Sequence, residues 1–313
     1  MALPGTAQTP GFKAVSESPK FCDFNQDFAM DTASSSASAV PSITAAHLAA
    51  RLGRGGQPLI LDVRKAPAFD AAVRLAAGAL RVVPDALPQA IPSLPRSGEV
   101  VVYCVHGHEV SQNAARQLCD AGLNARFLEG GITHWQEAVL PTMAKNAGLD
   151  LPASPGAPSR WITRERPKID RIACPWLIRR FIDPLAQFFY VPSDQVMAAA
   201  TRESAIPYDV PDVRISHRGA EGELCSFDAL IADCALDDPS LHALANIVRG
   251  ADTGKPDLTP QSAGLLAISL GLSVNFPDDQ AMLEQGMIVY DALYAWIKSA
   301  RAEVHNANLF KKT

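Results

Sequence analysis

The stretch Val100–Leu118, VVVYCVHGHEVSQNAARQL, decides the fold of the first half of the chain. Its opening run of valines and a tyrosine is typical of a buried strand in a parallel sheet. The strand ends at Cys104, a short polar loop follows, and the apolar spacing after Ser111 predicts a helix with Ser111 as its N-cap. Backbone N–H groups and the helix dipole favour negative charge at such a place, and therefore favour thiolate over thiol. The stretch predicts a reactive cysteine in an anion-binding loop.

Two flanking stretches extend this pattern. Upstream, PLILDVR (58–64) predicts a buried strand that ends in Asp62 and Arg64, which we expect to form an ion pair that supports the pocket floor. Downstream, RFLEGGITHW (126–135) predicts a strand, a double-glycine turn and the start of a helix. Because strands alternate with helices, we expect a parallel α/β sheet with its site at the carboxyl ends of the strands.

With these three landmarks in order, residues 41–145 resemble the rhodanese sulfurtransferase domain. The resemblance implies that Cys104 is the catalytic nucleophile, which takes sulfane sulfur from a donor as a persulfide and passes it to an acceptor without a cofactor. The common family loop is Cys-x-x-Gly-x-Arg-Ser, whereas the loop here is one residue longer and has Glu109 near the usual place of the arginine. The residues expected to hold the anion are Val105, His106, Gly107, His108, Glu109, Val110 and Ser111.

Length and composition limit the class of protein. A chain of 313 residues favours two domains, and a net charge of −5 argues against general coating of nucleic acid. Six scattered cysteines without a CxxC pair, no signal peptide and no long apolar run favour a cytoplasmic protein with reduced thiols and no membrane contact. The predicted organisation is a disordered tail (1–40), the rhodanese-like domain (41–145), a linker (146–159), a second domain (160–304) and a tail (305–313).

The second domain begins with a basic segment. Residues 160–180 carry seven basic against two acidic side chains, a local charge of +5 in an acidic chain. Pro175 suits the first position of a helix, which would make Cys174 its N-cap and lower the pKa of its thiol. The segment is interpreted either as an anion site or as an internally salt-bridged face. The residues of the predicted anion site are Arg164, Lys168, Arg171, Cys174 and Arg179.

The remainder of the chain is predicted to be mainly helical with a few short strands, and its long final helix is expected over 280–302. Glu284 and Asp291 on that helix are expected to pair with the arginines. Several side chains of metal-binding type follow the basic segment, at spacings that match no metal signature, so both a metal ion and a buried polar network remain open. The candidate metal ligands are His217, Cys225, Asp228 and His242.

Residues 160–300 resemble the C-terminal domain of the chromate-resistance protein ChrB. The segments that carry the resemblance are PKIDRIACPWLIRRFIDP, SHRG, ELCSFD, IVRGADT and DDQAMLEQGMIVYDALYAW. ChrB-type proteins are implicated in sensing chromate and in controlling its resistance genes. Their DNA-binding part lies in a different N-terminal domain, which a rhodanese-like domain replaces here, so we expect a link to chromate or oxidative stress but no DNA binding.

Three functions follow from the sequence. The first is a persulfide carrier whose partners are small sulfur donors or oxyanions and a protein acceptor that the sequence does not identify. The second is a non-catalytic sensor in which chromate or a metal bound to the second domain changes contact with another molecule. The third is a redox enzyme that uses Cys104 and Cys174 as a dithiol pair, which requires the two thiols to meet.

Overall fold

The computed structural model of the protein describes residues 40–149, 151 and 155–303, so the predicted tails lie outside it, apart from Val40. The described residues belong to one compact unit. None of the helices in these described residues is both long enough and apolar enough to cross a membrane.

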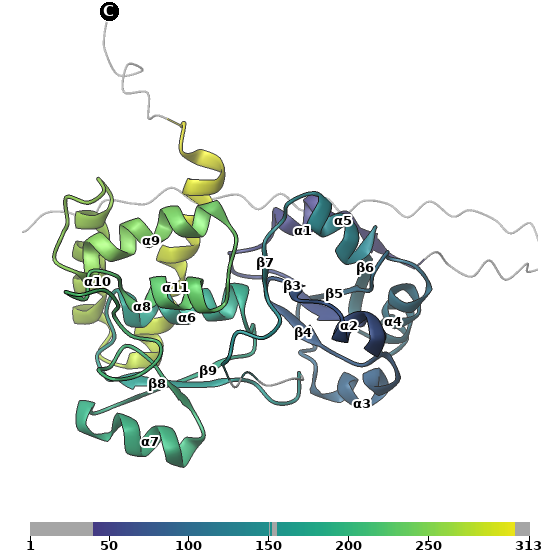
Figure 1. Cartoon of the computed structure of the whole chain (residues 1–313), viewed down its shortest axis with the longest axis horizontal. Helices are drawn as coiled ribbons and strands as arrows, with labels where there is room; N and C mark the ends of the chain where they lie inside the picture. Colours follow the sequence, from purple (N-terminus) through teal and green to yellow (C-terminus); the bar gives the residue numbers. More distant parts are fainter. Residues whose placement is uncertain (1–39, 150, 152–154, 304–313) are drawn as a thin grey trace, which may run out of the picture. The chain divides into compact units, whose positions relative to one another are not determined.

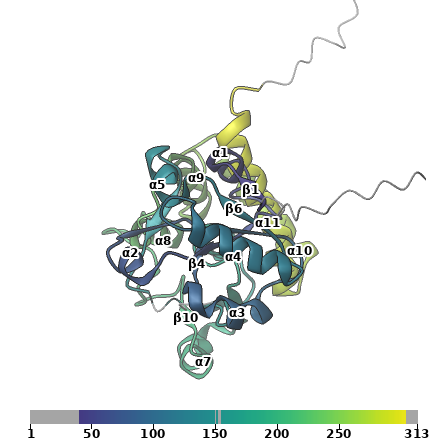
Figure 2. The ribbon, with the colours of Figure 1, turned by 90° about the vertical axis from the view of Figure 1, so that its right-hand side faces the viewer.

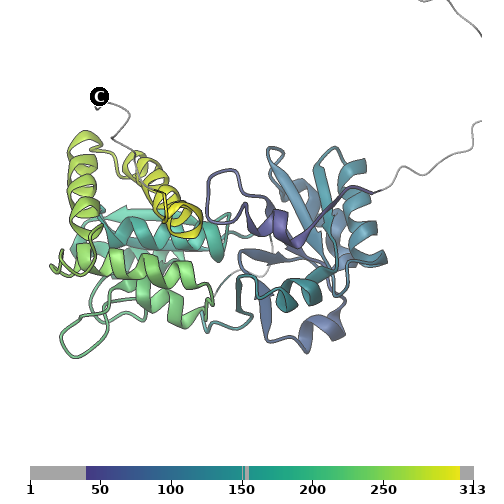
Figure 3. The same cartoon turned by 90° about the horizontal axis from the view of Figure 1, so that it is seen from above.

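The first half is an α/β layer structure (Figure 3). Its strands are β1 (Ser42–Ile43), β2 (Leu59–Asp62), β3 (Arg74–Ala76), β4 (Ala79–Arg81), β5 (Glu99–Tyr103), β6 (Asn124–Leu128) and β7 (Thr142–Ala144). Its helices are α1 (Ala45–Ala49), α2 (Ala66–Asp70), η1 (Pro84–Ala86), α3 (Leu87–Ala90), η2 (Ile91–Ser93), α4 (Glu109–Asp120) and α5 (Gly131–Glu137). Five strands form a parallel sheet in the order β1-β6-β5-β2-β4, while β3 and β7 pair antiparallel. The predicted parallel sheet is confirmed.

The central strand β5 shows why its sequence is continuously apolar. Val101 and Tyr103 point into one core cluster, which α1 and α5 cover, whereas Val100 and Val102 point into a second cluster with α4. Figure 2 is turned so that α4 faces the viewer in front of the sheet. Since both faces of the strand are covered by helices, every side chain is buried and no polar alternation appears.

The second half is mostly helical, as predicted (Figure 1). Its strands are β8 (Arg160–Arg164), β9 (Gln187–Val191) and β10 (Ile206–Pro207), which form a parallel sheet in the order β10-β8-β9. Its helices are α6 (Asp170–Phe181), η3 (Ser193–Gln195), α7 (Val196–Glu203), α8 (Ser226–Asp233), α9 (Pro239–Asp252), α10 (Ser262–Asn275), α11 (Asp279–Ala295) and the π-helical turn η4 (Trp296–Ala300). Trp176 of α6 is fully buried against Phe227 of α8 and Tyr290 of α11, with ring centroids 6.4 and 6.2 Å away. This aromatic cluster holds the helices together.

Helix α6 differs from the prediction. It begins at Asp170, so Cys174 lies inside the helix and is not its N-cap. Pro175 lacks the N–H that would bond the carbonyl of Arg171 four residues earlier. The hydroxyl of Tyr208 donates to that carbonyl instead, at 3.3 Å. A tertiary contact therefore compensates for an internal proline that, by local rules, marks a helix start.

Helix α11 begins at Asp279 and continues into η4, which ends at Ala300, close to the predicted bounds. The side chain of Asp278 accepts the Ala281 N–H at 2.8 Å and caps the helix. Glu284 pairs with Arg179 at 2.7 Å and Asp291 with Arg180 at 2.9 Å. The predicted role of both carboxylates as structural partners of the arginines is confirmed.

Candidate functional site

Cys104 directly follows β5 and is 6% exposed. Helix α4 starts at Glu109 with His108 as its N-cap, three residues before the predicted N-cap, so the assignment of Ser111 as N-cap is wrong. Ser111 instead lies in the first turn, fully buried, with its Oγ 3.2 Å from the Cys104 Sγ and 3.1 Å from the His108 carbonyl oxygen. The early start of the helix brings a hydroxyl to the thiol.

The loop favours the thiolate form of Cys104. Burial raises the pKa of the thiol, but its hydrogen bond with the Ser111 Oγ and those from the N–H groups of Ser111, His106 and His108 lower it, and the hydrogen bonds outweigh burial. These donors are the unpaired N–H groups of the loop and of the first helical turn. They would stabilise negative charge on the sulfur and on an anion placed beside it.

The double-glycine stretch fixes the shape of this loop. The Ile132 N–H donates to the Cys104 carbonyl at 3.0 Å, and the Thr133 N–H donates to the Val105 carbonyl at 3.1 Å. Gly131 has φ +59°, and a Cβ there would lie 2.5 Å from both carbonyl oxygens. Gly107 has φ +73°, and its Cβ would meet the Leu128 carbonyl oxygen at 2.6 Å. Only glycine permits this close approach between the loop and the start of α5.

The rim of the loop is polar. His106 and His108 are exposed, with ring centroids 5.9 Å apart. Glu109 is exposed in the first turn of α4, where its charge interacts favourably with the helix dipole. Val105 and Val110, the remaining loop residues, are half-buried. Glu109 thus occupies a helix-stabilising position in place of the family's usual arginine.

Asp62 and Arg64 form the expected ion pair, and both are buried. The Arg64 Nε donates to the Asp62 carboxylate at 2.9 Å, and the Tyr103 hydroxyl donates to it at 3.0 Å. Arg81 at the end of β4 lies 3.8 Å from the same carboxylate. Sequence reasoning missed Tyr103 and Arg81, although both are at the strand ends where a parallel sheet places its site.

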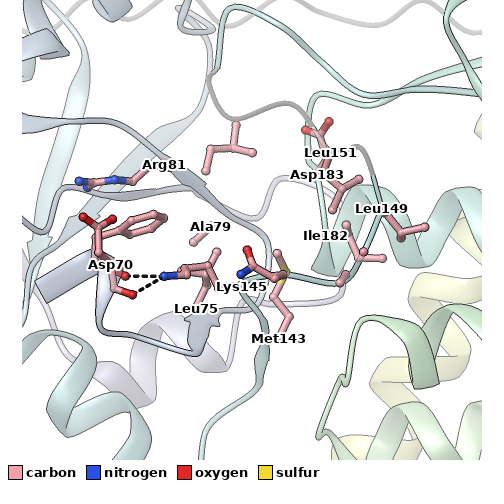
Figure 4. Close-up of a pocket in the computed structure, with 15 residues that line it drawn as sticks. Asp70, Leu75, Ala79, Arg81, Met143, Lys145, Leu149, Leu151, Ile182 and Asp183 are labelled. Carbon is pink, nitrogen blue, oxygen red and sulfur yellow. Dashed lines mark hydrogen bonds between the residues drawn. The ribbon is translucent and has the colours of Figure 1, made fainter. Parts of the chain in front are cut away.

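A cavity of about 610 Å³ adjoins this ion-pair network (Figure 4). Charged side chains from both halves line it, among them Asp70, Arg81, Lys145 and Asp183. The Lys145 Nζ donates to the carbonyls of Phe69 and Asp70, at 2.8 Å each. Cys104 is absent from its lining residues, so this cavity and the thiol are separate features.

The basic segment is internally paired. Arg164 and Arg171 both contact Asp209, at 3.2 and 3.4 Å, while Arg179 contacts Glu284. Lys168 is half-buried before α6. The salt-bridged alternative therefore describes these arginines, whose charges face carboxylates of the same chain.

The prediction of a lowered pKa for Cys174 is wrong. The thiol is fully buried, and its Sγ lies 3.7 Å from Asp170. Burial, and then the negative charge of Asp170, raise its pKa well above the usual value. The dithiol hypothesis requires Cys174 to be accessible, and the thiol is 0% exposed.

The four candidate metal ligands do not come together. Cys225 is the N-cap of α8, where Asp228 accepts its N–H at 3.0 Å, and Asp228 pairs with Arg249 at 2.6 Å. His242 is exposed on α9. In the described residues, His217 instead brings its ring nitrogen near carboxylates of Asp170 and Asp209, within 4.8 Å of one another.

Sequence reasoning missed both aspartates, although Asp209 lies only eight residues before His217. In the sequence, Asp170 stands out only as one of two acidic residues in the basic segment, and Asp209 belongs to no recognisable motif. The surplus of arginines in the basic segment was a signal for Asp209, since Arg164 and Arg171 need a nearby carboxylate and both contact it.

Comparison with known proteins matches each half to a different family. Residues 44–138 match the rhodanese-like domain, and residues 161–297 match ChrB, C-terminal domain. Protein ChrB of Cupriavidus metallidurans is 30% identical over 174 residues, which are 50% of this chain and 51% of that protein. The chain thus spans about half the length of this curated relative.

Solved structures align with about a third of the chain. A rhodanese-related protein from Thermoplasma volcanium is 30% identical with a TM-score of 0.29, covering 33% of this chain and 96% of that chain. A thiosulfate sulfurtransferase from Pseudomonas aeruginosa is 28% identical with a TM-score of 0.30, covering 33% of this chain and 19% of that chain. By its two family matches, the chain combines a rhodanese-like domain with a ChrB C-terminal domain.

Proposed function

We propose that the protein carries sulfur as a persulfide on Cys104. The observation that carries this proposal is the set of hydrogen-bond partners around one thiol: the N–H groups of His106, His108 and Ser111, which donate to it, and the Ser111 Oγ at 3.2 Å. Burial in an apolar pocket makes a cysteine inert, whereas hydrogen-bond donors at a helix amino end make it nucleophilic. Cys104 is surrounded by hydrogen-bond donors of this kind.

The transfer balances without a further oxidant or reductant. With thiosulfate as donor, the Cys104 thiolate attacks the outer sulfur, a new S–S bond forms, and the S–S bond of the donor breaks to release sulfite. The loop N–H groups stabilise the negative charge on the resulting persulfide. An acceptor thiolate then attacks the terminal sulfur, takes it, and returns the Cys104 thiolate.

The second domain suggests the biological process that this sulfur transfer serves. Its match to the ChrB C-terminal domain supports a role in chromate resistance or oxidative stress, in which a protein acceptor receives the sulfur. A reducing cytoplasm would keep the Cys104 thiol available. Neither DNA nor a membrane is needed as partner.

The test is to incubate the purified full chain with thiosulfate or, separately, with a persulfide donor, and to weigh the intact protein. We expect an added mass of roughly 32 Da on the wild type and none on Cys104→Ser, because the thiolate is the nucleophile. Cys234→Ser is the matched control, since that thiol is buried outside the loop, and it should gain the adduct like wild type. An unmodified wild type that is folded, with a titratable Cys104 thiol, would reject the proposal.

One observation favours a second function. The grouping of His217 with buried carboxylates suits a metal-responsive sensor, in which the rhodanese-like domain acts as a binding module. The same mass measurement separates the two, because a module without transfer chemistry gains no sulfur from either donor.

A further inference from the structure

Three aspartates from separate parts of the second half surround the imidazole of His217. We call this group the His217 cluster; it consists of Asp170, Asp209, His217 and Asp252. Asp170 is the first residue of α6, Asp252 is the last residue of α9, and Asp209 follows β10. The His217 Nε2 lies 3.1 Å from Asp252, 3.6 Å from Asp209 and 3.9 Å from Asp170. Side chains from α6, from α9 and from the segment that follows β10 thus converge on one point.

The carboxylates are fixed before any ligand arrives. Asp170 is 1% exposed and accepts the N–H groups of Ser226 and Phe227, at 2.6 and 3.1 Å, from the amino end of α8. Asp209 is 6% exposed and accepts the Ser226 hydroxyl at 2.9 Å. Such support positions carboxylates as the outer hydrogen bonds of a metal site do.

The orientation of the imidazole independently favours a metal ligand. The His217 Nδ1 lies 3.2 Å from the carbonyl oxygen of Gly222, which can only accept, so Nδ1 carries a proton. The Nε2 that faces the three aspartates is therefore the atom available for a bond to an ion. A backbone carbonyl on one ring nitrogen and a metal on the other is the usual arrangement of a ligating histidine.

The spacing of these side chains and their access to solvent also suit a bound metal ion. The ligand atoms of Asp170, Asp209 and His217 all lie within 4.8 Å of one another, close to the roughly 4.4 Å that separates two ligands about 2.2 Å from one ion. The His217 side chain is 35% exposed, so an ion reaches the cluster from solvent. In the described part of the chain, Asp252 has the imidazole as its polar contact, which leaves carboxylate oxygen free for an ion.

We propose that the His217 cluster binds one divalent transition-metal ion, of the class that accepts both carboxylate and imidazole, such as Mn²⁺ or Fe²⁺. The ion replaces the proton at Nε2 and is held by His217 together with Asp170 and Asp209, while Asp252, 3.1 Å from Nε2, adds negative charge beside it. Arg164 and Arg171 lie against Asp209 and offset part of the negative charge. This proposal does not depend on persulfide chemistry at Cys104.

The competing interpretation is a structural ion network. Hydrogen bonding to Asp252, opposed by burial, raises the pKa of His217 to about 9, so a protonated imidazole would also satisfy the carboxylates. The two interpretations differ in one measurable property, which is whether a metal ion binds and needs His217.

The experiment titrates Mn²⁺ into chelator-treated full chain carrying Cys104→Ser, which removes the reactive thiolate as a rival ligand. Free Mn²⁺ is followed by its electron paramagnetic resonance signal. We expect one Mn²⁺ per chain, and at least tenfold weaker binding in His217→Ala and in Asp252→Asn. His242→Ala, which changes an exposed histidine on α9, should bind like its parent.

The outcomes are decisive in both directions. Absence of binding by the folded parent, or equal binding by His217→Ala, would leave the cluster as a structural ion network and overturn the proposal. Circular dichroism verifies the fold of each variant. Asp252→Asn preserves side-chain size, so it decides the question even if His217→Ala unfolds.

Discussion

Cys104 and Cys174 lie near the start of two helices of equal length, and their surroundings are opposite. Cys104 precedes α4 and faces the N–H groups that the first turn leaves unpaired, which lower the pKa of its thiol. Cys174 is the fifth residue of α6, inside the helix and beside the Asp170 carboxylate, and its pKa is raised. Both thiols are buried, so hydrogen-bond donors and neighbouring charge, rather than burial alone, decide which cysteine reacts.

The largest expected effect is a difference in alkylation. At pH 7 and with limiting iodoacetamide, we expect Cys104 to react at least about a hundredfold faster than Cys174, Cys225 and Cys234, because a thiolate is the nucleophile and these three thiols, at most 1% exposed against 6% for Cys104, react only after local opening. Burial raises the pKa of Cys225 and raises that of Cys234 to about 12, which slows them further. Mass spectrometry of each cysteine peptide gives the rates separately.

Urea supplies the control for this comparison. In the unfolded chain the pKa differences vanish, and all cysteines should react at similar rates. Equal rates for Cys104 and Cys174 in the folded protein would contradict the contrast between the two helix starts.

A smaller effect is expected from the glycine that shapes the Cys104 loop. In Gly131→Ala the new methyl group would lie 2.5 Å from the carbonyl oxygens of Cys104 and Val105. Strain at this φ of +59° adds to the overlap, so we expect about 2–4 kcal/mol of destabilisation and loss of the fast alkylation of Cys104. Urea unfolding and the labelling rate measure the two results.

Gly122→Ala is the matched control. Gly122 also has a positive φ, +81°, but a Cβ there meets nothing within 4 Å. We expect about 1–2 kcal/mol of destabilisation from backbone strain alone and unchanged alkylation of Cys104. If both variants lose labelling equally, the loop does not depend on its contact with Gly131.

The two halves also differ in how far the sequence predicts them. In the rhodanese-like half, the strand β5, the cysteine loop and the double-glycine turn are adjacent in sequence or follow the rule for parallel strands, so local patterns were sufficient. The N-cap of α4 lies three residues before the predicted one, because Ser111 contacts the thiol and does not cap the helix.

In the second half the decisive contacts depend on tertiary packing. Tyr208 supports the internal proline of α6, and Asp209 lies against His217 only once β10 and the following loop are placed. No local spacing encodes either contact. Cys225 and Asp228 were close in sequence, yet they form a helix cap with Arg249. Short-range pairing of polar residues therefore indicated caps, whereas the cluster with ligand geometry arose from tertiary structure.

The smallest effect concerns a single donor at Cys104. Ser111→Ala removes the hydroxyl 3.2 Å from the sulfur and leaves the N–H donors, so we expect the alkylation midpoint to move to higher pH and the rate at pH 7 to fall about three- to tenfold. Gln112→Ala is the control, since its side chain donates to the Gly107 carbonyl at 3.1 Å and bonds the loop without contacting the thiol. An unchanged midpoint in Ser111→Ala would mean that the backbone N–H groups alone hold the thiolate. The contrast with Cys174 would then rest on the position of the thiol relative to the first helical turn and not on Ser111.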